Sequence, residues 1–178
     1  MTYSITLNVF LPKKIVDALR SVKVSKNLAY DWRDSGYCHI TLKSISKLEV
    51  SPKDELLAEW ISLSKQILDK QKPFKVKVSS VEKFPNALFA KVESKELVKL
   101  HNKLFKILPS GQPQFENQNY TPHASIGVLD KDAQVISEKE LHFGEFEVRE
   151  VQLIVWNWDT KKLKDCKIFH KFSLTKTL

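Results

Sequence analysis

Two short segments of the chain carry the same arrangement of a histidine and a hydroxyl residue. In YCHITLKSI, His39 precedes Thr41 by two positions, and in YTPHASIGVL, His123 precedes Ser125 by two positions. Both segments are otherwise largely apolar, which is typical of strands, and successive side chains of a strand point to opposite faces. Each segment is therefore expected to present an imidazole and a hydroxyl on one face and apolar neighbours on the other.

Two imidazoles that face one cleft can divide the proton transfers of a displacement reaction. A neutral ring accepts a proton from the nucleophile, while a charged ring donates one to the leaving oxygen. The hydroxyls can donate hydrogen bonds to the non-bridging oxygens of a phosphate, where charge accumulates in the transition state. The pattern predicts metal-free phosphodiester chemistry with four catalytic residues, namely His39, Thr41, His123 and Ser125.

Three further side chains are candidates for substrate binding. Lys43 lies two positions after Thr41, so the strand period puts it on the face of His39, where it contacts the phosphate or is a solvated lysine at a sheet edge. At the equivalent place in the second segment, Gly127 leaves space for a ligand or for a close backbone approach. Tyr120 and Trp32 are aromatic residues that could line the cleft or stack on a nucleobase, with core packing as the alternative.

A histidine metal site is a competing interpretation of the same residues. The hydroxyl companions of the two histidines, and the lack of a nearby acidic third ligand, argue against it. Cys38 and Cys166 match no metal-ligand spacing. We expect the remaining histidines to be structural or exposed because they have no partner motif: His101, His142 and His170.

The composition bounds the partners without fixing a function. The chain has 178 residues and a formal net charge of +8, carried mostly by lysines spread along the sequence. This charge makes nucleic acid the leading partner class, although a solvated lysine-rich surface gives the same composition. No apolar run is long enough to span a bilayer and no signal peptide is recognisable, which predicts a cytoplasmic protein without a membrane partner. No long heptad pattern is present, and we expect a monomer.

Hydrophobic periodicity predicts the elements that position these side chains. Ser51 and Ser94 are expected to cap two helices, with Pro52 at the first position of the earlier one. A turn over residues 159–162 links the last two strands. Besides the two histidine segments, strands are expected over residues 4–11, 74–78, 87–92, 146–158 and 167–174, and helices over residues 13–22, 52–70 and 95–108.

The order of these elements indicates an α+β fold with mainly antiparallel sheet and with helices on the outer faces. The two motif histidines are 84 residues apart, one in each half of the chain. Two sheets that each present one histidine strand to a common groove explain why the motif occurs twice.

These residues give the sequence a resemblance to the two-histidine (2H) phosphoesterase superfamily, closest to its branch of 2′-5′ RNA ligase-like and RNA 2′,3′-cyclic phosphodiesterase proteins. The family signature is a pair of His-x-Thr/Ser-x motifs with apolar x, which fits residues 39–42 and 123–126. Trp32 before the first motif, Phe84-Pro85 after the third strand, and Tyr120 with Pro122 before the second motif extend the match to nearly the whole chain. The chain departs from the family after each motif, where residues 44–46 replace a phenylalanine-leucine-glycine and residues 127–129 lack an arginine.

The resemblance implies one bilobal domain over residues 1–178, with two pseudo-symmetric lobes around a basic, open central cleft. It implies opening of an RNA or nucleotide 2′,3′-cyclic phosphate, or cleavage of a 2′-5′ phosphodiester, with reversible 2′-5′ ligation as the reverse reaction and no metal or other cofactor. On the family model His123 would activate water or a hydroxyl, and His39 would protonate the leaving ribose oxygen.

A function of a different class stays open beside this one. An RNA-binding or nucleotide-binding module could retain the cleft without turnover, and the altered residues after each motif are compatible with it. The substrate is also open between tRNA, a small cyclic nucleotide, a 2′-5′ oligoadenylate and an ADP-ribose derivative.

Overall fold

The computed structural model describes residues 2–24, 28–34, 38–129, 142–157 and 166–175. Its helices are α1 (Lys13–Leu19), α2 (Asp54–Leu68) and α3 (Lys95–Phe105), with short 3-10 turns at Trp32–Asp34, Pro113–Phe115 and Asn117–Asn119. Its strands are β1 (Tyr3–Phe10), β2 (Tyr30–Asp31), β3 (His39–Leu48), β4 (Phe74–Phe84), β5 (Ala87–Glu93), β6 (His123–Val128), β7 (Gly144–Val148), β8 (Glu150–Asn157) and β9 (Cys166–Ser173).

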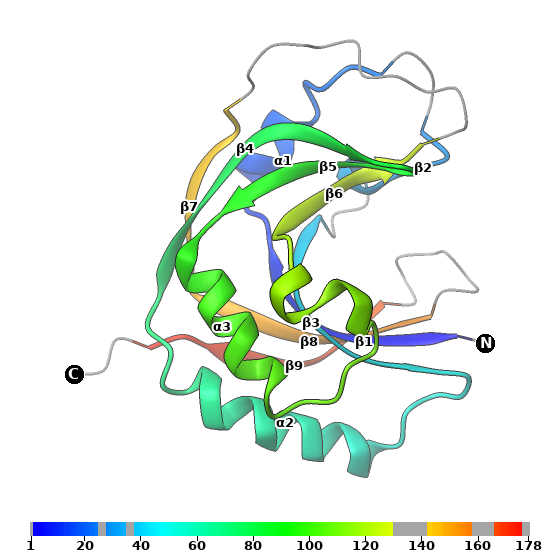
Figure 1. Ribbon diagram of the computed structural model, residues 1–178, viewed down its shortest axis with the longest axis vertical. Helices are drawn as coiled ribbons and strands as arrows, with labels where there is room; N and C mark the ends of the chain where they lie inside the picture. The colour runs from blue at the N-terminus through cyan, green and yellow to red at the C-terminus, as the bar shows by residue number, and fades with distance from the viewer. Residues whose placement is uncertain (1, 25–27, 35–37, 130–141, 158–165, 176–178) are drawn as a thin grey trace.

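The described strands form one nine-stranded sheet in the order β7-β4-β5-β6-β3-β1-β8-β9, and β2 adds to β6. Every pairing between these strands is antiparallel. The sheet is strongly curled, with β4, β5 and β6 in its upper half and β1, β8 and β9 crossing its lower half (Figure 1). We call β7-β4-β5-β6 the β6 lobe and β3-β1-β8-β9 the β3 lobe. The α+β class with two antiparallel lobes is thus confirmed, although the lobes belong to one continuous sheet and not to two.

The two lobes meet where β3 pairs with β6, through Ile40 and Ala124. This ladder is short, whereas β1 pairs with β3 along its whole length from Tyr3 to Phe10. The two motif strands are therefore direct neighbours at the junction of the lobes.

Alternation along the strands separates a core face from a cleft face. On β1, Ile5, Leu7 and Val9 are almost fully buried in the main core. The same core contains apolar side chains of all three described α-helices, so the helices cover the outer face of the curled sheet, as expected from the sequence. Figure 1 shows α2 below the lower half of the sheet, outside the curl. None of the helices among the described residues is long and apolar enough to cross a membrane.

Most element boundaries agree with the sequence prediction within a few residues, and Ser94 caps α3 by accepting a hydrogen bond from the Leu97 amide at 3.3 Å. The predicted cap of α2 is wrong, because the helix begins at Asp54 after Lys53, without a side-chain cap. Asp54 and Glu55 occupy its first turn instead, where their negative charge interacts favourably with the helix dipole.

The single strand predicted over residues 146–158 is also wrong. The structure divides it at Arg149 into β7, which pairs with β4, and β8, which pairs with β1. The chain passes from one lobe to the other at this point, so the segment predicted as one strand supplies a strand to each lobe. The turn predicted at residues 159–162 lies outside the described residues.

Candidate active site

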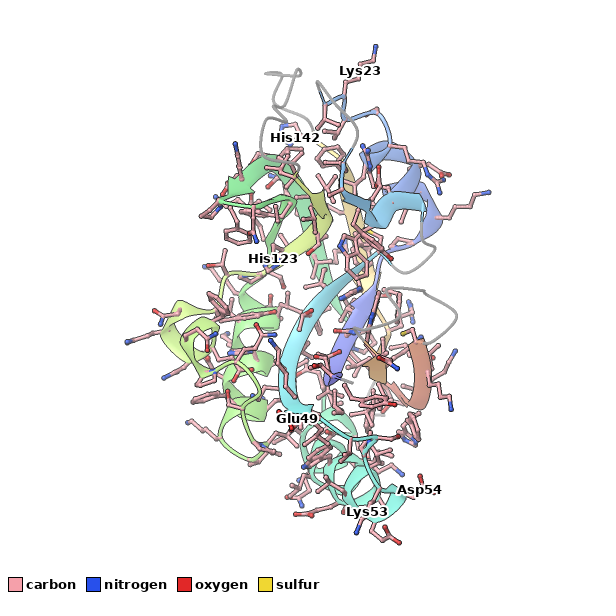
Figure 2. All side chains as sticks on the ribbon, turned by 90° about the vertical axis from the view of Figure 1, so that its right-hand side faces the viewer. Lys23, Glu49, Lys53, Asp54, His123 and His142 are labelled. Carbon is pink, nitrogen blue, oxygen red and sulfur yellow. The ribbon has the colours of Figure 1, made fainter. Side chains whose placement is uncertain are left out.

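The two histidine motifs interleave at the lobe junction. Ile40 and Ala124 are paired and fully buried on the core face. In an antiparallel ladder the residues before and after such a pair face the other way, so His39 is placed beside Ser125 and Thr41 beside His123. Each imidazole thus has the hydroxyl of the opposite motif as its neighbour across the strands. Figure 2 shows His123 between the two halves of the molecule, at the level where they meet.

A cavity of about 620 Å³ lies on this face of the sheet. All seven residues singled out from the sequence line it: Trp32, His39, Thr41, Lys43, Tyr120, His123 and Ser125. The side chains of His39, Thr41, His123 and Ser125 are half-buried, so a ligand can reach them. The strand period of two therefore places the motif side chains as predicted.

His123 is held in one tautomer by its own segment. Its Nδ1 lies 2.8 Å from the Thr121 carbonyl oxygen, which can only accept, so Nδ1 carries the proton and Nε2 is left as an acceptor. The rings of Phe84 and Phe89 stand edge-on to the imidazole, with centroids 5.2 and 5.4 Å away. Burial lowers the pKa of His123, and the hydrogen bond to Thr121 offsets this only in part. The lowered pKa favours the neutral form of this ring, which is the form that can accept a proton.

His39 also lies between two aromatic side chains. Its ring centroid is 5.6 Å from that of Trp32 and 6.1 Å from that of Phe10. Trp32 in turn contacts Trp156 at 4.8 Å. These aromatic residues form a small cluster on the cleft face, separate from the main core. Each motif histidine thus lies between two aromatic rings: Phe84 and Phe89 of the β6 lobe beside His123, and Phe10 of β1 and Trp32, which follows β2, beside His39.

The segment that carries Trp32 is anchored by a buried arginine. Arg33 Nε donates to Asp31 Oδ1 at 2.8 Å, and Arg33 Nη1 donates to the Val22 carbonyl at 2.7 Å. Next to this segment, a Cβ added at Gly127 would lie 2.6 Å from the Tyr30 carbonyl oxygen. Gly127 thus permits close approach of β2 to β6, which was one of the two roles expected for it.

Lys43 lines the cavity, but the strand period assumed for it is wrong, because a register shift between β1 and β3 places Lys43 opposite the core residue Leu7. Lys43 is 1% exposed, and its Nζ lies 2.6 and 2.8 Å from the two carboxylate oxygens of Glu116. The Ser44 amide and the Ser110 hydroxyl also donate to this carboxylate. Burial lowers the pKa of Lys43, and the hydrogen bond and charge of Glu116 act in the opposite direction.

Tyr120 and His101 connect the loop before the second motif to the first motif strand. The Tyr120 hydroxyl donates to the Thr41 carbonyl oxygen at 2.9 Å, and its ring stacks on His101 with centroids 3.8 Å apart. His101 Nδ1 donates to the Leu42 carbonyl oxygen at 2.8 Å, and its Nε2 accepts from the Asn117 amide at 3.0 Å. The ring of Tyr120 is thus placed at the cavity with one face covered by His101.

Sequence reasoning missed several residues of the cavity wall. Glu116 and Phe115 belong to a polar loop without regular periodicity, and nothing in the sequence links that loop to Lys43. The polar side of β1 was visible as alternation of Ser4, Thr6 and Asn8, which is usual for a strand with one solvated face. These side chains instead line the cavity.

The cleft is less basic than the family resemblance implied. Lys43 is the one lysine among the described residues that line it, and the negative charge of Glu116 balances its positive charge. The described part of the chain contains no group of three or more histidine, cysteine or acidic side chains that could hold a metal ion. His142 is exposed, and Figure 2 shows it at the far end of one half of the molecule, away from His123.

Comparisons with known proteins agree with this geometry. A family model described as the 2′-5′ RNA ligase superfamily matches residues 12–160. Among solved structures, E. coli LigT complexed with ATP superposes with a TM-score of 0.72 at 13% identity, covering 98% of this chain and 99% of LigT. A protein of Thermus thermophilus gives a TM-score of 0.64 at 20% identity, covering 96% of this chain and 97% of its own. A structure described as a phosphoesterase gives 0.73 at 14% identity, with 97% and 99% covered. The curated proteins give no significant match.

Proposed function

The chain belongs to the 2′-5′ RNA ligase superfamily, and on this premise we propose that it is a phosphodiesterase that opens 2′,3′-cyclic phosphates or cleaves 2′-5′ phosphodiester bonds of RNA or nucleotides. The proposed catalysis is general acid and base transfer by two histidines, without a metal ion or another cofactor. The observation that carries the proposal is the interleaving of His39, Thr41, His123 and Ser125 around one cavity.

His123 is the proposed general base. Its Nε2 takes a proton from water, and the water oxygen forms a bond to phosphorus. The bond from phosphorus to the leaving ribose oxygen breaks, and that oxygen takes a proton from His39. Each histidine is expected to contribute a factor of about 10²–10⁴ to the rate. Burial lowers the pKa of His123, which supports its assignment as the base.

Thr41 and Ser125 are the proposed donors to the non-bridging phosphate oxygens. Each is adjacent, across the strand pair, to the histidine of the opposite motif, so both hydroxyls are directed at a phosphorus atom held between the two rings. Neutral donors matter here because Lys43 is engaged by Glu116. We propose that Lys43 affects phosphate binding indirectly. Its ion pair with Glu116 holds this part of β3 in place beside the phosphate.

A nucleotide is supported as the ligand by the solved complexes of LigT with ATP, NADP+, 3′-AMP and phosphate. At the rim of the cavity in this chain, Phe115 is 61% exposed and stands beside Gln112 and Asn119. An exposed aromatic face next to side-chain amides is suited to stacking a base and bonding its edge. We assign base stacking to Phe115, with Tyr120 and Trp32 lining the same cavity as supports. The net charge of +8 supports RNA as the source of the nucleotide. The cytoplasmic location and the monomeric state stay predictions.

The test is hydrolysis of a panel of 2′,3′-cyclic mononucleotides and 2′-5′-linked dinucleotides by the purified chain in the presence of a chelator, with analysis of which ribose oxygen keeps the phosphate. Turnover that persists with chelator supports the proposal. Saturable nucleotide binding with no turnover of any member of the panel would reject it in favour of a binding module. Turnover that the chelator abolishes and a divalent metal restores would also reject it.

A further inference from the structure

The cavity extends beyond the catalytic residues along the cleft face of β1. Ser4, Thr6 and Asn8 line it, and Ser4 and Asn8 are only 3% and 2% exposed. Burial of polar side chains is unfavourable unless they form hydrogen bonds. A row of buried polar groups beside a cavity is therefore a feature that needs an explanation.

Two polar atoms of this wall have no hydrogen-bond partner among the described residues. They are Oδ1 of Asn8 and Oγ of Ser44. Nδ2 of Asn8 is satisfied, because it donates to Thr6 Oγ1 at 2.9 Å, so the side-chain amide is oriented with its acceptor unmatched. A buried acceptor without a partner is unfavourable, because it has lost its hydrogen bonds to water and gained none in exchange. A ligand that donates a hydrogen bond here would remove that cost.

The chemistry of this wall selects a neutral group. Asn8, Thr6 and Ser44 carry no charge, and the adjacent Lys43 and Glu116 neutralise each other. Trp156 pairs with Ser4 across the strands, but it is 7% exposed and packed against Trp32, so it offers no open ring face to a base. A sugar hydroxyl, which both donates and accepts, fits this set of side chains better than a phosphate or a nucleobase does.

The position of the wall identifies which part of the substrate it meets. Asn8 is the direct strand partner of Thr41, and Phe10 is that of His39, so the polar face of β1 begins beside the catalytic hydroxyl of the β3 lobe. In the proposed function, His39 protonates the leaving oxygen. His39 is on β3, which lies between β1 and β6, and β6 carries His123. The group that departs on the far side of His39 from the proposed base therefore lies toward β1.

We propose that Asn8, Thr6 and Ser44 form a subsite for the ribose of a leaving nucleoside. This inference rests on the proposed function and narrows its substrate class to a phosphodiester between two nucleosides, such as a 2′-5′-linked dinucleotide. Water gives a proton to His123 and bonds to phosphorus. The bond from phosphorus to the 5′-oxygen of the second nucleoside breaks, and that nucleoside leaves with its 5′-hydroxyl protonated by His39. A cyclic mononucleotide contains no second ribose and leaves the subsite unused.

The first test compares Asn8→Ala with the wild-type protein on a 2′-5′-linked dinucleotide and on a 2′,3′-cyclic mononucleotide. The ratio of the two kcat/KM values, dinucleotide over cyclic, is expected to fall about tenfold, as the loss of a buried hydrogen bond implies. Asn102→Ala is a matched control, since Asn102 Oδ1 is also buried without a partner but does not line the cavity. The control is expected to keep the wild-type ratio, and Ser44→Ala gives a second, independent variant.

The second test compares two dinucleotides whose leaving nucleoside carries either ribose or 2′,3′-dideoxyribose. The wild-type protein is expected to lose about tenfold in kcat/KM with the dideoxy substrate, and Asn8→Ala is expected to lose little more. Equal wild-type values for the two dinucleotides would overturn the assignment to a sugar hydroxyl. In the first test, an unchanged ratio of dinucleotide to cyclic-mononucleotide kcat/KM in Asn8→Ala would overturn the subsite itself. Failure of the wild-type protein to cleave either substrate class would instead overturn the proposed function.

Discussion

The ammonium of Lys43 lies 2.6 Å from a carboxylate oxygen of Glu116, and both side chains are almost completely buried in the wall of the cavity. Lys43 follows the first histidine motif, whereas Glu116 comes from the loop that leads to the second. The ion pair thus ties the two motif segments together in the wall of the cavity that the motif histidines line.

Removing one partner of this pair is expected to destabilise the protein. Glu116→Gln leaves the buried ammonium without a counter-charge, so the free energy of unfolding should fall by about 3 kcal/mol. Urea denaturation measures the change. Asp17→Asn is the control, because the Arg20–Asp17 pair is 45% and 46% exposed and its loss should shift the midpoint far less. Equal shifts in the two variants would contradict a structural role for the buried pair.

Single replacement of either motif histidine should abolish most of the turnover. His39→Ala and His123→Ala are each expected to lower kcat by a factor of about 10²–10⁴, while the double variant loses much less than the product of the two. Assays with chelator measure these values. His142→Ala, at an exposed position away from the cavity, is expected to keep wild-type kcat. Full activity in either single motif variant would rule out the two-histidine mechanism.

The dependence of kcat/KM on pH should be bell-shaped, because one histidine must be neutral and the other charged. Burial lowers the pKa of His123, so the acid limb should have its midpoint below the ordinary histidine value of about 6.5. Phe84→Ala opens one side of this ring to water and should move the limb upward. A profile with one limb, or a limb unmoved by Phe84→Ala, would argue against His123 as the base.

His101 should make the protein less stable in mild acid. Burial lowers its pKa in the folded state, so below about pH 6.5 the unfolded chain binds more protons than the folded chain. The free energy of unfolding should therefore fall as the pH falls from about 7.5 to 5. His101→Gln removes the titrating group and should reduce this slope, while the other histidines with lowered pKa, His123 and His170, still contribute. The same slope in both proteins would show that His101 is not responsible.

Phe115 should contribute to binding and not to the chemical step. Phe115→Ala is expected to raise KM for a nucleotide substrate about tenfold with kcat nearly unchanged, as the loss of one base stack implies. Steady-state kinetics separate the two constants. Val50→Ala is the control, since Val50 is 70% exposed and does not line the cavity. A change in kcat alone would remove base stacking as the role of Phe115.

The motif strands could be predicted from the sequence because the alternation that defines them is contained in a few consecutive residues. Alternation with period two fixes the face of His39 and Thr41 from their immediate neighbours, and the second motif repeats the same pattern. The cap by Ser94 was equally local, since it depends on a residue three positions away. Such features need no knowledge of what packs against the segment.

Features that depend on distant contacts could not be found in this way. Glu116 is 73 residues from its partner Lys43 and lies in a loop whose path is set by the fold. At Arg149 and Glu150 the apolar positions change phase, but only the distant pairing of the two halves with β4 and β1 shows that two strands meet there. Asn8 looked like part of a solvated face, since polar alternation is the same whether water or a ligand cavity lies beside it.

The pairing of Ile40 with Ala124 also bears on how substrate binding energy is used. Main-chain pairing of the two motif strands sets the spacing between the two half-sites before any ligand arrives. In the proposed mechanism, a phosphate that enters therefore finds acid, base and hydroxyl donors already arranged. The favourable contacts it makes can then lower the activation barrier, because none of that energy is spent on drawing the lobes together.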